Sequence, residues 1–232
     1  NYYNELFETN IIDYYISGDL NEKYIKTFKN KFNNNESSID FKLNKISKRK
    51  PKVIIENQKT EQAIIYLGYN LNPFTHKNDY EAAVLLDLYI GGFSESVLFK
   101  IIREEMGLCY SIRSNLNVNK GTLVINAGVD NKRSEEALKA ITNLINELKT
   151  KEITDEAFLV LKNNFIHSYK QSRDSQLSVV RATYVNDKLK RVNDVDIKIK
   201  KILKVKKQEV MKLLNMLSLD TTYILEEKLE EN

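Results

Sequence analysis

The sequence predicts an α/β (α+β) fold in which a mixed, largely antiparallel sheet packs against helices. The first observation is strict alternation of apolar residues over positions 62–71, which is typical of a half-buried strand: Ala63, Ile65, Leu67, Tyr69 and Leu71. The second is the turn Asn119–Gly121 between two short apolar runs, which predicts an antiparallel hairpin. The third is the spacing of apolar residues by three and four along residues 134–217, which predicts successive helices.

The composition indicates a globular protein and excludes several other classes. The 232 residues are 42% hydrophobic and 29% charged, with only 2 Pro and 7 Gly, which excludes collagen, long disordered tails and disulfide scaffolds. No apolar run reaches the roughly 18–20 residues that span a bilayer, so no membrane contact is expected. The first residue is Asn1 and no signal peptide is recognisable, so we expect a piece of a longer polypeptide. The single cysteine suits a reducing compartment, and a cytoplasmic location is predicted.

The N-terminal part reads as helix, strand and helix, followed by a linker. Ile11–Ile16 is predicted as a strand from its β-branched and aromatic content, and Asp19 or Asn21 is the expected cap of the next helix. Residues 33–51 are polar, basic and without a period, which is typical of a linker. We therefore predict that residues 1–45 are the tail of a preceding domain plus a linker, and that residues 46–232 form the main domain.

The main domain is predicted to alternate short strands with helices. After Gly91-Gly92-Phe93, Ser94 is the expected N-cap of a helix that ends at Gly107. Thr154 is the expected cap of a second long helix. The predicted strands are 52–56, 62–71, 108–116, 122–129 and 220–225, and the predicted helices are 79–88, 94–106, 134–148, 154–170, 175–189, 195–203 and 208–217.

No complete catalytic constellation is present in the sequence. A zinc peptidase site needs two histidines about one helical turn apart and a carboxylate base, but His76 and His167 stand far apart and neither has this pattern around it. Both histidines are therefore predicted to be structural or on the surface, and no metal site is predicted. Cys109 lies in an apolar run, where a buried and inert thiol is the expectation.

Arg103 and Tyr110 are the remaining candidates for chemistry. They are seven residues apart across a tight helix-to-strand turn, which can bring a guanidinium and a phenol close together. Both groups can donate hydrogen bonds to a developing oxyanion. Two structural alternatives stay open: Tyr110 alternates with Leu108 and Ile112 and could belong to the core, and Arg103 could pair with a nearby carboxylate.

Two segments carry a resemblance to a known family. His76–Ser114 includes Gly91-Gly92-Phe93-Ser-Glu-Ser-Val-Leu-Phe and then Arg103-Glu-Glu-Met-Gly-Leu-Cys-Tyr110-Ser. Gly121–Asp130 ends in Ala-Gly-Val-Asp. Together these segments resemble the second domain of the pitrilysin-type (insulinase-like) zinc metallopeptidases, which include mitochondrial processing peptidase. The resemblance implies a metallopeptidase-type two-layer domain, and the similarity of Ile11–Ile16 to the end of the family's preceding domain implies that residues 1–45 include its tail.

The resemblance also implies roles for individual residues. In that family two homologous domains enclose a chamber, the first holds zinc through His-x-x-Glu-His, and the second contributes an Arg and a Tyr that contact the scissile carbonyl. The matching positions are Arg103 and Tyr110, and the glycine-rich loop that contacts substrate corresponds to Gly91, Gly92 and Phe93. The zinc motif is absent and Phe93 replaces a glycine, so no zinc and no turnover are expected of this chain alone.

The expected function is therefore peptide or protein processing that depends on a partner. Zinc is expected in a preceding N-terminal domain or in a partner subunit, with a peptide as substrate and a dimer as the assembly. The chain also resembles a bacterial subgroup in which one subunit lacks zinc ligands, so a non-catalytic scaffold is the alternative. Residues 188–212 hold ten Lys or Arg against three Asp or Glu, but these are interleaved with apolar residues as on a solvated helix face, and no nucleic-acid partner is predicted.

Overall fold

The computed structural model describes residues 2–31, 49–71, 79–117, 120–188, 190–191 and 193–227. The chain divides into two compact units, each built from two separate stretches of sequence. The first unit comprises Asn1–Lys42 with Ile166–Ile199, and the second comprises Leu43–Phe165 with Lys200–Asn232. The predicted division at residues 45 and 46 stays a prediction.

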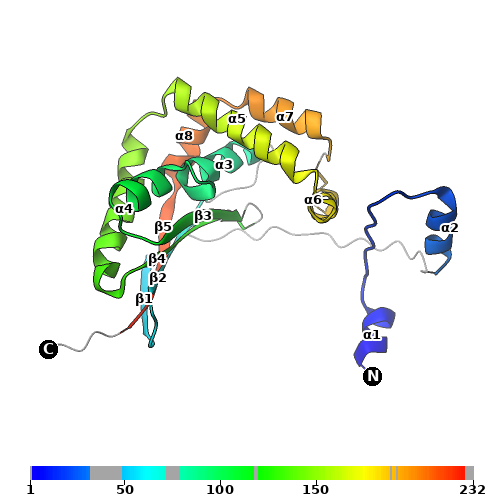
Figure 1. Ribbon diagram of the computed structural model, residues 1–232, viewed down its shortest axis with the longest axis horizontal. Coiled ribbons are helices and arrows are strands. Elements are labelled where there is room, and N and C mark those ends of the chain that lie inside the picture. The colour runs from blue at the N-terminus through cyan, green and yellow to red at the C-terminus, as the bar shows by residue number, and fades with distance from the viewer. Residues whose placement is uncertain are drawn as a thin grey trace. The chain divides into compact units, whose positions relative to one another are not determined.

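The second unit contains a five-stranded sheet with the strand order β1-β5-β2-β4-β3 (Figure 1). β2, β4 and β3 are antiparallel neighbours, β2 and β5 are also antiparallel, and only β1 and β5 run parallel. This confirms the predicted mixed, largely antiparallel sheet. The strands are β1 Lys52–Asn57, β2 Ala63–Asn70, β3 Ser111–Asn117, β4 Thr122–Val129 and β5 Ser218–Glu226.

Helices pack against one face of this sheet (Figure 1). In β2 the alternate residues Ala63, Ile65, Leu67 and Tyr69 are buried, as their periodicity predicts. They join one core with apolar residues of the helices, including Leu85 and Ile141. The helical elements in or entering this unit are α3 Tyr80–Asp87, the π-helices η1 Leu88–Gly92 and η2 Phe99–Glu105, the short 3₁₀-helix η3 Asn131–Arg133, α4 Ser134–Thr150, α5 Asp155–Ser172, α7 Val195–Lys204 and α8 Lys207–Met216.

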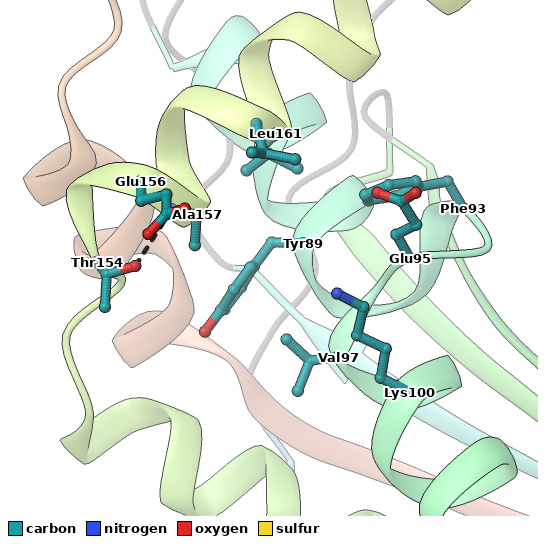
Figure 2. Close-up of a pocket in the computed structure, with 10 residues that line it drawn as sticks. Tyr89, Phe93, Glu95, Val97, Lys100, Thr154, Glu156, Ala157 and Leu161 are labelled. Carbon is teal, nitrogen blue, oxygen red and sulfur yellow. Dashed lines mark hydrogen bonds between the residues drawn. The ribbon is translucent and has the colours of Figure 1, made fainter.

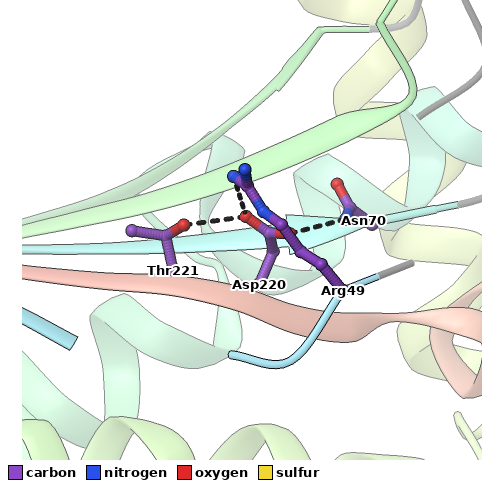
Figure 3. A network of polar contacts seen from close by, with 4 residues as sticks. All are labelled: Arg49, Asn70, Asp220 and Thr221. Atoms are coloured by element: carbon purple, nitrogen blue, oxygen red, sulfur yellow. Dashed lines mark hydrogen bonds and ion pairs between the residues drawn. The ribbon is translucent and has the colours of Figure 1, made fainter. Parts of the chain in front are cut away.

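A polar network ties the start of this unit to β5 (Figure 3). Arg49 donates to both carboxylate oxygens of Asp220, each at 2.8 Å. Asn70 and Thr221 donate to the same carboxylate at 3.2 and 2.7 Å. These donors stabilise the charged form, and the pKa of Asp220 falls to about 2.

The first unit contains α1 Tyr2–Thr9, α2 Glu22–Lys31, α6 Gln176–Lys188 and the adjoining ends of α5 and α7. The predicted strand at Ile11–Ile16 is wrong, because these residues form no strand among the described residues. A β-strand needs a neighbour for its backbone groups, and composition alone does not supply one. The segment instead contacts α6 through side chains: Tyr15 donates to Asp187 at 2.6 Å, and Asp13 pairs with Lys188.

The other predicted elements agree with the structure except at some ends. The helix predicted from Ser94 begins later, because the Ser96 carbonyl accepts its first bond, from the Lys100 amide at 3.0 Å. The strand predicted from Leu108 begins at Ser111. Thr154 caps α5 as predicted, with its hydroxyl accepting from the Ala157 amide at 3.2 Å. Residues 33–48 of the predicted linker, His76, and Asn119 of the predicted turn lie outside the described residues.

Candidate functional site

Arg103 projects from the last turn of η2 and is accessible. Its guanidinium carbon lies 4.5 Å from the centroid of the Phe99 ring, and its Nε lies 3.7 Å from a carboxylate oxygen of Glu104. The Arg103 side chain is 40% exposed and that of Glu104 is 59% exposed. The predicted alternative of a carboxylate partner is therefore present, but an exposed pair of this kind contributes at most about 1 kcal/mol and leaves the guanidinium free to bind another acceptor.

The turn after η2 carries the chain from Arg103 to Tyr110. Gly107 adopts φ +59°, a left-handed conformation that glycine tolerates best. The amide of Leu108 closes the turn by donating to the Ile102 carbonyl at 3.0 Å. Arg133 donates to the Gly107 carbonyl at 3.1 Å while it also holds Glu136. This role of Arg133 was not predictable from local sequence patterns, because 26 residues separate it from the turn.

Tyr110 points away from the core. Its side chain is 56% exposed, whereas Leu108 and Ile112 are 2% and 6% exposed. The alternative in which Tyr110 belongs to the core is therefore wrong. The cause is that Tyr110 still belongs to the turn and precedes β3, so the alternation of a strand does not apply to it. Its amide donates to the Gly128 carbonyl at 2.8 Å, which fixes the backbone from which the phenol extends.

Cys109, which lies between Arg103 and Tyr110 in the sequence, is buried. Burial raises the pKa of its thiol to about 11, with the positive charge of Arg103 opposing this and the negative charge of Glu104 adding to it. The thiol is therefore neutral near pH 7 and is a poor nucleophile. The predicted burial of Cys109 is confirmed, and its inertness stays a prediction.

Gly91 and Gly92 end a π-helix that lies directly against β3. A Cβ atom added at Gly91 would stand 2.6 Å from the Ser114 amide nitrogen, a distance that real Cβ atoms do not reach. At Gly92 it would meet the Asp87 carbonyl oxygen at 3.1 Å. The glycine pair therefore has a packing function, and its predicted contact with substrate stays a prediction.

The half-buried carboxylate of Asp87 fastens the same junction, and sequence reasoning missed it. The Ser114 hydroxyl lies 2.6 Å from a carboxylate oxygen of Asp87 and 3.0 Å from the Asp87 carbonyl oxygen. Burial raises the pKa of Asp87, while the hydrogen bonds from Ser114 and the Leu116 backbone oppose the rise. The contact joins the end of α3 to β3. The available signal was an aspartate at the end of the apolar run Ala82–Leu86.

Phe93 forms one wall of a pocket between the loop after η1 and the start of α5 (Figure 2). The pocket has a volume of about 300 Å³. Figure 2 shows the Tyr89 ring and the Lys100 side chain directed into it. Burial raises the pKa of Tyr89. On the α5 side the walls are Thr154, Glu156, Ala157, Val160 and Leu161.

The described residues do not fit a zinc site. Among them, no three His, Cys, Asp or Glu side chains are grouped so that they could hold a metal ion. His167 is exposed on α5, where it stands alone as a candidate ligand, and His76 lies outside the described residues. In the same part of the chain, no helix is both long and apolar enough to cross a membrane.

Comparison with known sequences gives a consistent result. Residues 1–165 match the model of a family described as the peptidase M16 inactive domain. A protein of Bacillus subtilis named probable inactive metalloprotease YmfF is 24% identical over 226 residues, which are 96% of this chain and 53% of the relative. The uncharacterized zinc protease YmxG of the same organism is 26% identical over 151 residues, 61% of this chain and 35% of the relative. The chain thus spans about half or less of these relatives.

Comparison with solved structures supports the fold. A conserved protein from Enterococcus faecalis superposes with a TM-score of 0.77 at 21% identity, over 93% of this chain and 52% of that one. A protease from Helicobacter pylori gives 0.74 at 21% identity, over 90% and 53%. A peptidase M16 inactive domain from Pseudomonas fluorescens gives 0.66 at 17% identity, over 82% and 48%. At these identities the likeness concerns the fold.

Proposed function

Because this chain belongs to the peptidase M16 inactive-domain family, we propose that it completes a chamber for peptide processing together with a zinc-bearing homologous domain or subunit. The observation that supports this most directly is the pair Arg103 and Tyr110. Their side chains are 40% and 56% exposed on the two sides of the Gly107 turn. Two accessible hydrogen-bond donors around one tight turn suit the recognition of a peptide carbonyl.

The proposed role of this pair is to stabilise negative charge on the carbonyl oxygen of the peptide that is cleaved. The guanidinium of Arg103 carries a permanent positive charge, and the phenol of Tyr110 is a neutral donor. Donors fixed before the reaction stabilise the developing oxyanion more than the neutral carbonyl. The Arg133 bond to the turn and the Tyr110 amide bond to Gly128 hold the backbone for this purpose. Zinc, which activates water, is expected on the homologous partner.

The peptide is proposed to pass along Gly92 and Phe93 of the loop that is predicted to contact substrate. Gly92 is exposed and Phe93 is half-buried at the rim of the pocket. An apolar side chain of a bound peptide could therefore contact Phe93 and Tyr89 while its backbone follows the loop. Gly91 is buried against β3 and would support the loop without touching substrate.

The test is cleavage of a fluorogenic peptide by the chain assembled with its zinc-bearing partner. Arg103→Ala and Tyr110→Phe are each expected to lower kcat by about 10²–10³-fold, which is the usual effect of losing one oxyanion donor. Arg181→Ala and Tyr24→Phe remove the same groups at exposed positions elsewhere and should leave kcat unchanged. The chain by itself should show no chelator-sensitive cleavage; such cleavage would contradict the proposal.

A second candidate function is a non-catalytic scaffold that holds the zinc-bearing partner. It is favoured by the contacts of Arg103 with Phe99 and Glu104, because they give this side chain a role in the structure that needs no substrate. If both substitutions leave kcat unchanged while assembly persists, the scaffold is the function. The coding sequence before Asn1 distinguishes two arrangements of the proposed chamber. If it encodes His-x-x-Glu-His, the zinc site belongs to the same polypeptide. If it does not, the zinc site is expected on a separate subunit.

We also propose a bacterial, cytoplasmic setting and a dimeric assembly with the zinc-bearing homologue. The setting is supported by the single cysteine, which is buried and neutral, and by bacterial relatives. Cell fractionation and co-purification with the zinc-bearing homologue test the two parts separately.

A further inference from the structure

The outer edge of β1 is exposed and apolar, which is unusual for an edge strand. All six residues of Lys52–Asn57 are exposed, and the consecutive side chains of Val53, Ile54 and Ile55 are 67%, 47% and 54% exposed. β1 is the first strand in the sheet order, with β5 on its other side. Native sheets usually protect such an edge with charged residues, proline or a bulge, because it is ready to pair with another strand.

The backbone groups that face outward can be identified. The Gln58 amide donates to the Glu226 carbonyl of β5 at 3.0 Å. Backbone groups of successive residues point to opposite sides of a strand, so those of Ile54 also point toward β5. Those of Val53 and Ile55 therefore point to the outer edge. A strand added there would form hydrogen bonds with these two residues and, by the same alternation, with Asn57.

The side chains of β1 are complementary to themselves in the antiparallel direction. If two copies pair about a two-fold axis at Ile54, Lys52 lies opposite Glu56, and Val53 lies opposite Ile55. In this register Val53 and Ile55 exchange backbone bonds, and the two Ile54 residues form the central pair without hydrogen bonds. The outward-facing backbone groups of Val53 and Ile55 are thus hydrogen-bonded in this register. Two pairs of opposite charge flank three apolar pairs.

We propose that this chain associates with a second copy of itself through β1, antiparallel and centred on Ile54. The Glu56 side chain is held in place by two donors: the Tyr223 hydroxyl and the side-chain amide of Gln58 donate to its two carboxylate oxygens at 2.6 and 2.7 Å. A carboxylate retains further acceptor sites for the Lys52 ammonium of the second copy. Sliding the register by two residues would set Glu56 opposite Ile54 or Lys52 opposite Ile54, so the charges favour the centred register.

This association between two identical copies is independent of the proposed peptidase role and of the proposed dimer with a zinc-bearing homologue. β1 and β3 are the opposite edges of the sheet, and Tyr110 directly precedes β3. Pairing at β1 therefore leaves the candidate site accessible. Because the measurements below involve no cleavage and no zinc, the association and the peptidase role can fail separately.

The first experiment is cross-linking of the full chain through single cysteines. In the proposed register the two Ile54 Cα atoms lie about 4.5 Å apart, within the range of a disulfide, whereas the two Val53 Cα atoms stand diagonally at about 7–8 Å or more. Ile54→Cys should form covalent dimers under mild oxidation, and Val53→Cys should form several-fold fewer. The native Cys109 is buried, so the unmodified chain gives the background level of covalent dimer with which both variants are compared. Equal cross-linking of the two variants would overturn the proposed register.

The second experiment exchanges the charges and measures dimer dissociation by sedimentation. Lys52→Glu and Glu56→Lys each place two like-charge pairs across the interface, and each should raise the dissociation constant at least about tenfold. In a mixture of the two variants both pairs again join opposite charges, one with its original sign and one reversed, so a heterodimer should form where neither variant dimerises alone. If the unmodified chain stays monomeric at the highest concentration tested, or the mixture fails to associate, a second copy is not the occupant of this edge.

Discussion

At the scale of single residues, Gly91 shows how closely the helical layer approaches the sheet beside the candidate site. The π-helix η1 ends where a hydrogen atom is the only substituent that fits against the Ser114 amide. The same strand residue is bound through its hydroxyl to Asp87, one helical turn earlier. Gly91 and Asp87 together set the position of the loop that carries Phe93.

Gly91→Ala is therefore expected to destabilise the fold by about 1–3 kcal/mol, the usual cost of overpacking. The added methyl carbon would lie 2.6 Å from backbone, and backbone cannot rotate away as a side chain can. Gly68→Ala is the matched control, because its Cβ would meet Thr221 at an ordinary 3.7 Å. Thermal unfolding followed by circular dichroism measures both. Equal melting temperatures for the two variants would show that η1 and β3 can move apart without loss of stability.

At the scale of elements, periodicity and caps predicted what local sequence controls. The structure places β4 at Thr122–Val129, as predicted. α4 and α5 differ from their predictions only at their ends, because their apolar spacing and the Thr154 cap are local signals. The strand predicted at Ile11–Ile16 failed because β structure depends on a partner. The parallel pairing of β1 with β5 could not be predicted, since it joins residues at opposite ends of the chain.

The candidate site was likewise predictable where local sequence controls it, and not where it depends on contacts between distant residues. The spacing of Arg103 and Tyr110 and the glycine between them indicated a tight turn, and the structure has one. The exposure of Tyr110 was not predictable, because alternation with Leu108 and Ile112 favoured the core. The contact of Arg133 with Gly107 and that of Asp87 with Ser114 bring together distant residues, and no local pattern carries such information.

The network around Asp220 predicts a pH dependence of stability at the junction of β2, β5 and Arg49. Its pKa of about 2 in the folded protein lies below the ordinary value near 3.9. The folded state thus favours the charged carboxylate, and this stabilisation is complete above the unfolded pKa and is lost as the pH falls from about 4 to about 2. Arg49→Ala should lower the urea midpoint at pH 7, and the difference from the unmodified chain should shrink toward pH 2.

Arg49→Lys is the control for this effect. Lysine keeps the charge but cannot reproduce the two parallel hydrogen bonds of the guanidinium, so its urea midpoint at pH 7 should fall between those of the other two proteins. A difference between Arg49→Ala and the unmodified chain that stays constant from pH 7 to pH 2 would assign the stabilisation to packing by Arg49 instead of the Asp220 charge.

At the scale of the whole molecule, the two compact units differ in how many apolar side chains they bury. The second unit holds the continuous core formed by the sheet and its covering helices. In the first unit, Asn186 is the buried residue of α6, and Ile11, Ile12 and Ile16 are between 39% and 48% exposed. Units with few buried apolar contacts open locally at a lower free energy than the global unfolding. The first unit should therefore open independently of the second.

Hydrogen exchange with peptide resolution tests this expectation. Amides of α6 should exchange faster than those of β2 and β4, and Tyr15→Phe should accelerate them further because it removes the bond from the Tyr15 hydroxyl to Asp187. β2 and β4 should keep their protection in that variant. Tyr24→Phe makes the same chemical change at a side chain that is 60% exposed and should alter neither unit. If Tyr15→Phe reduced protection equally in α6, β2 and β4, the chain would unfold as one cooperative body, and the division into two units would have no energetic meaning.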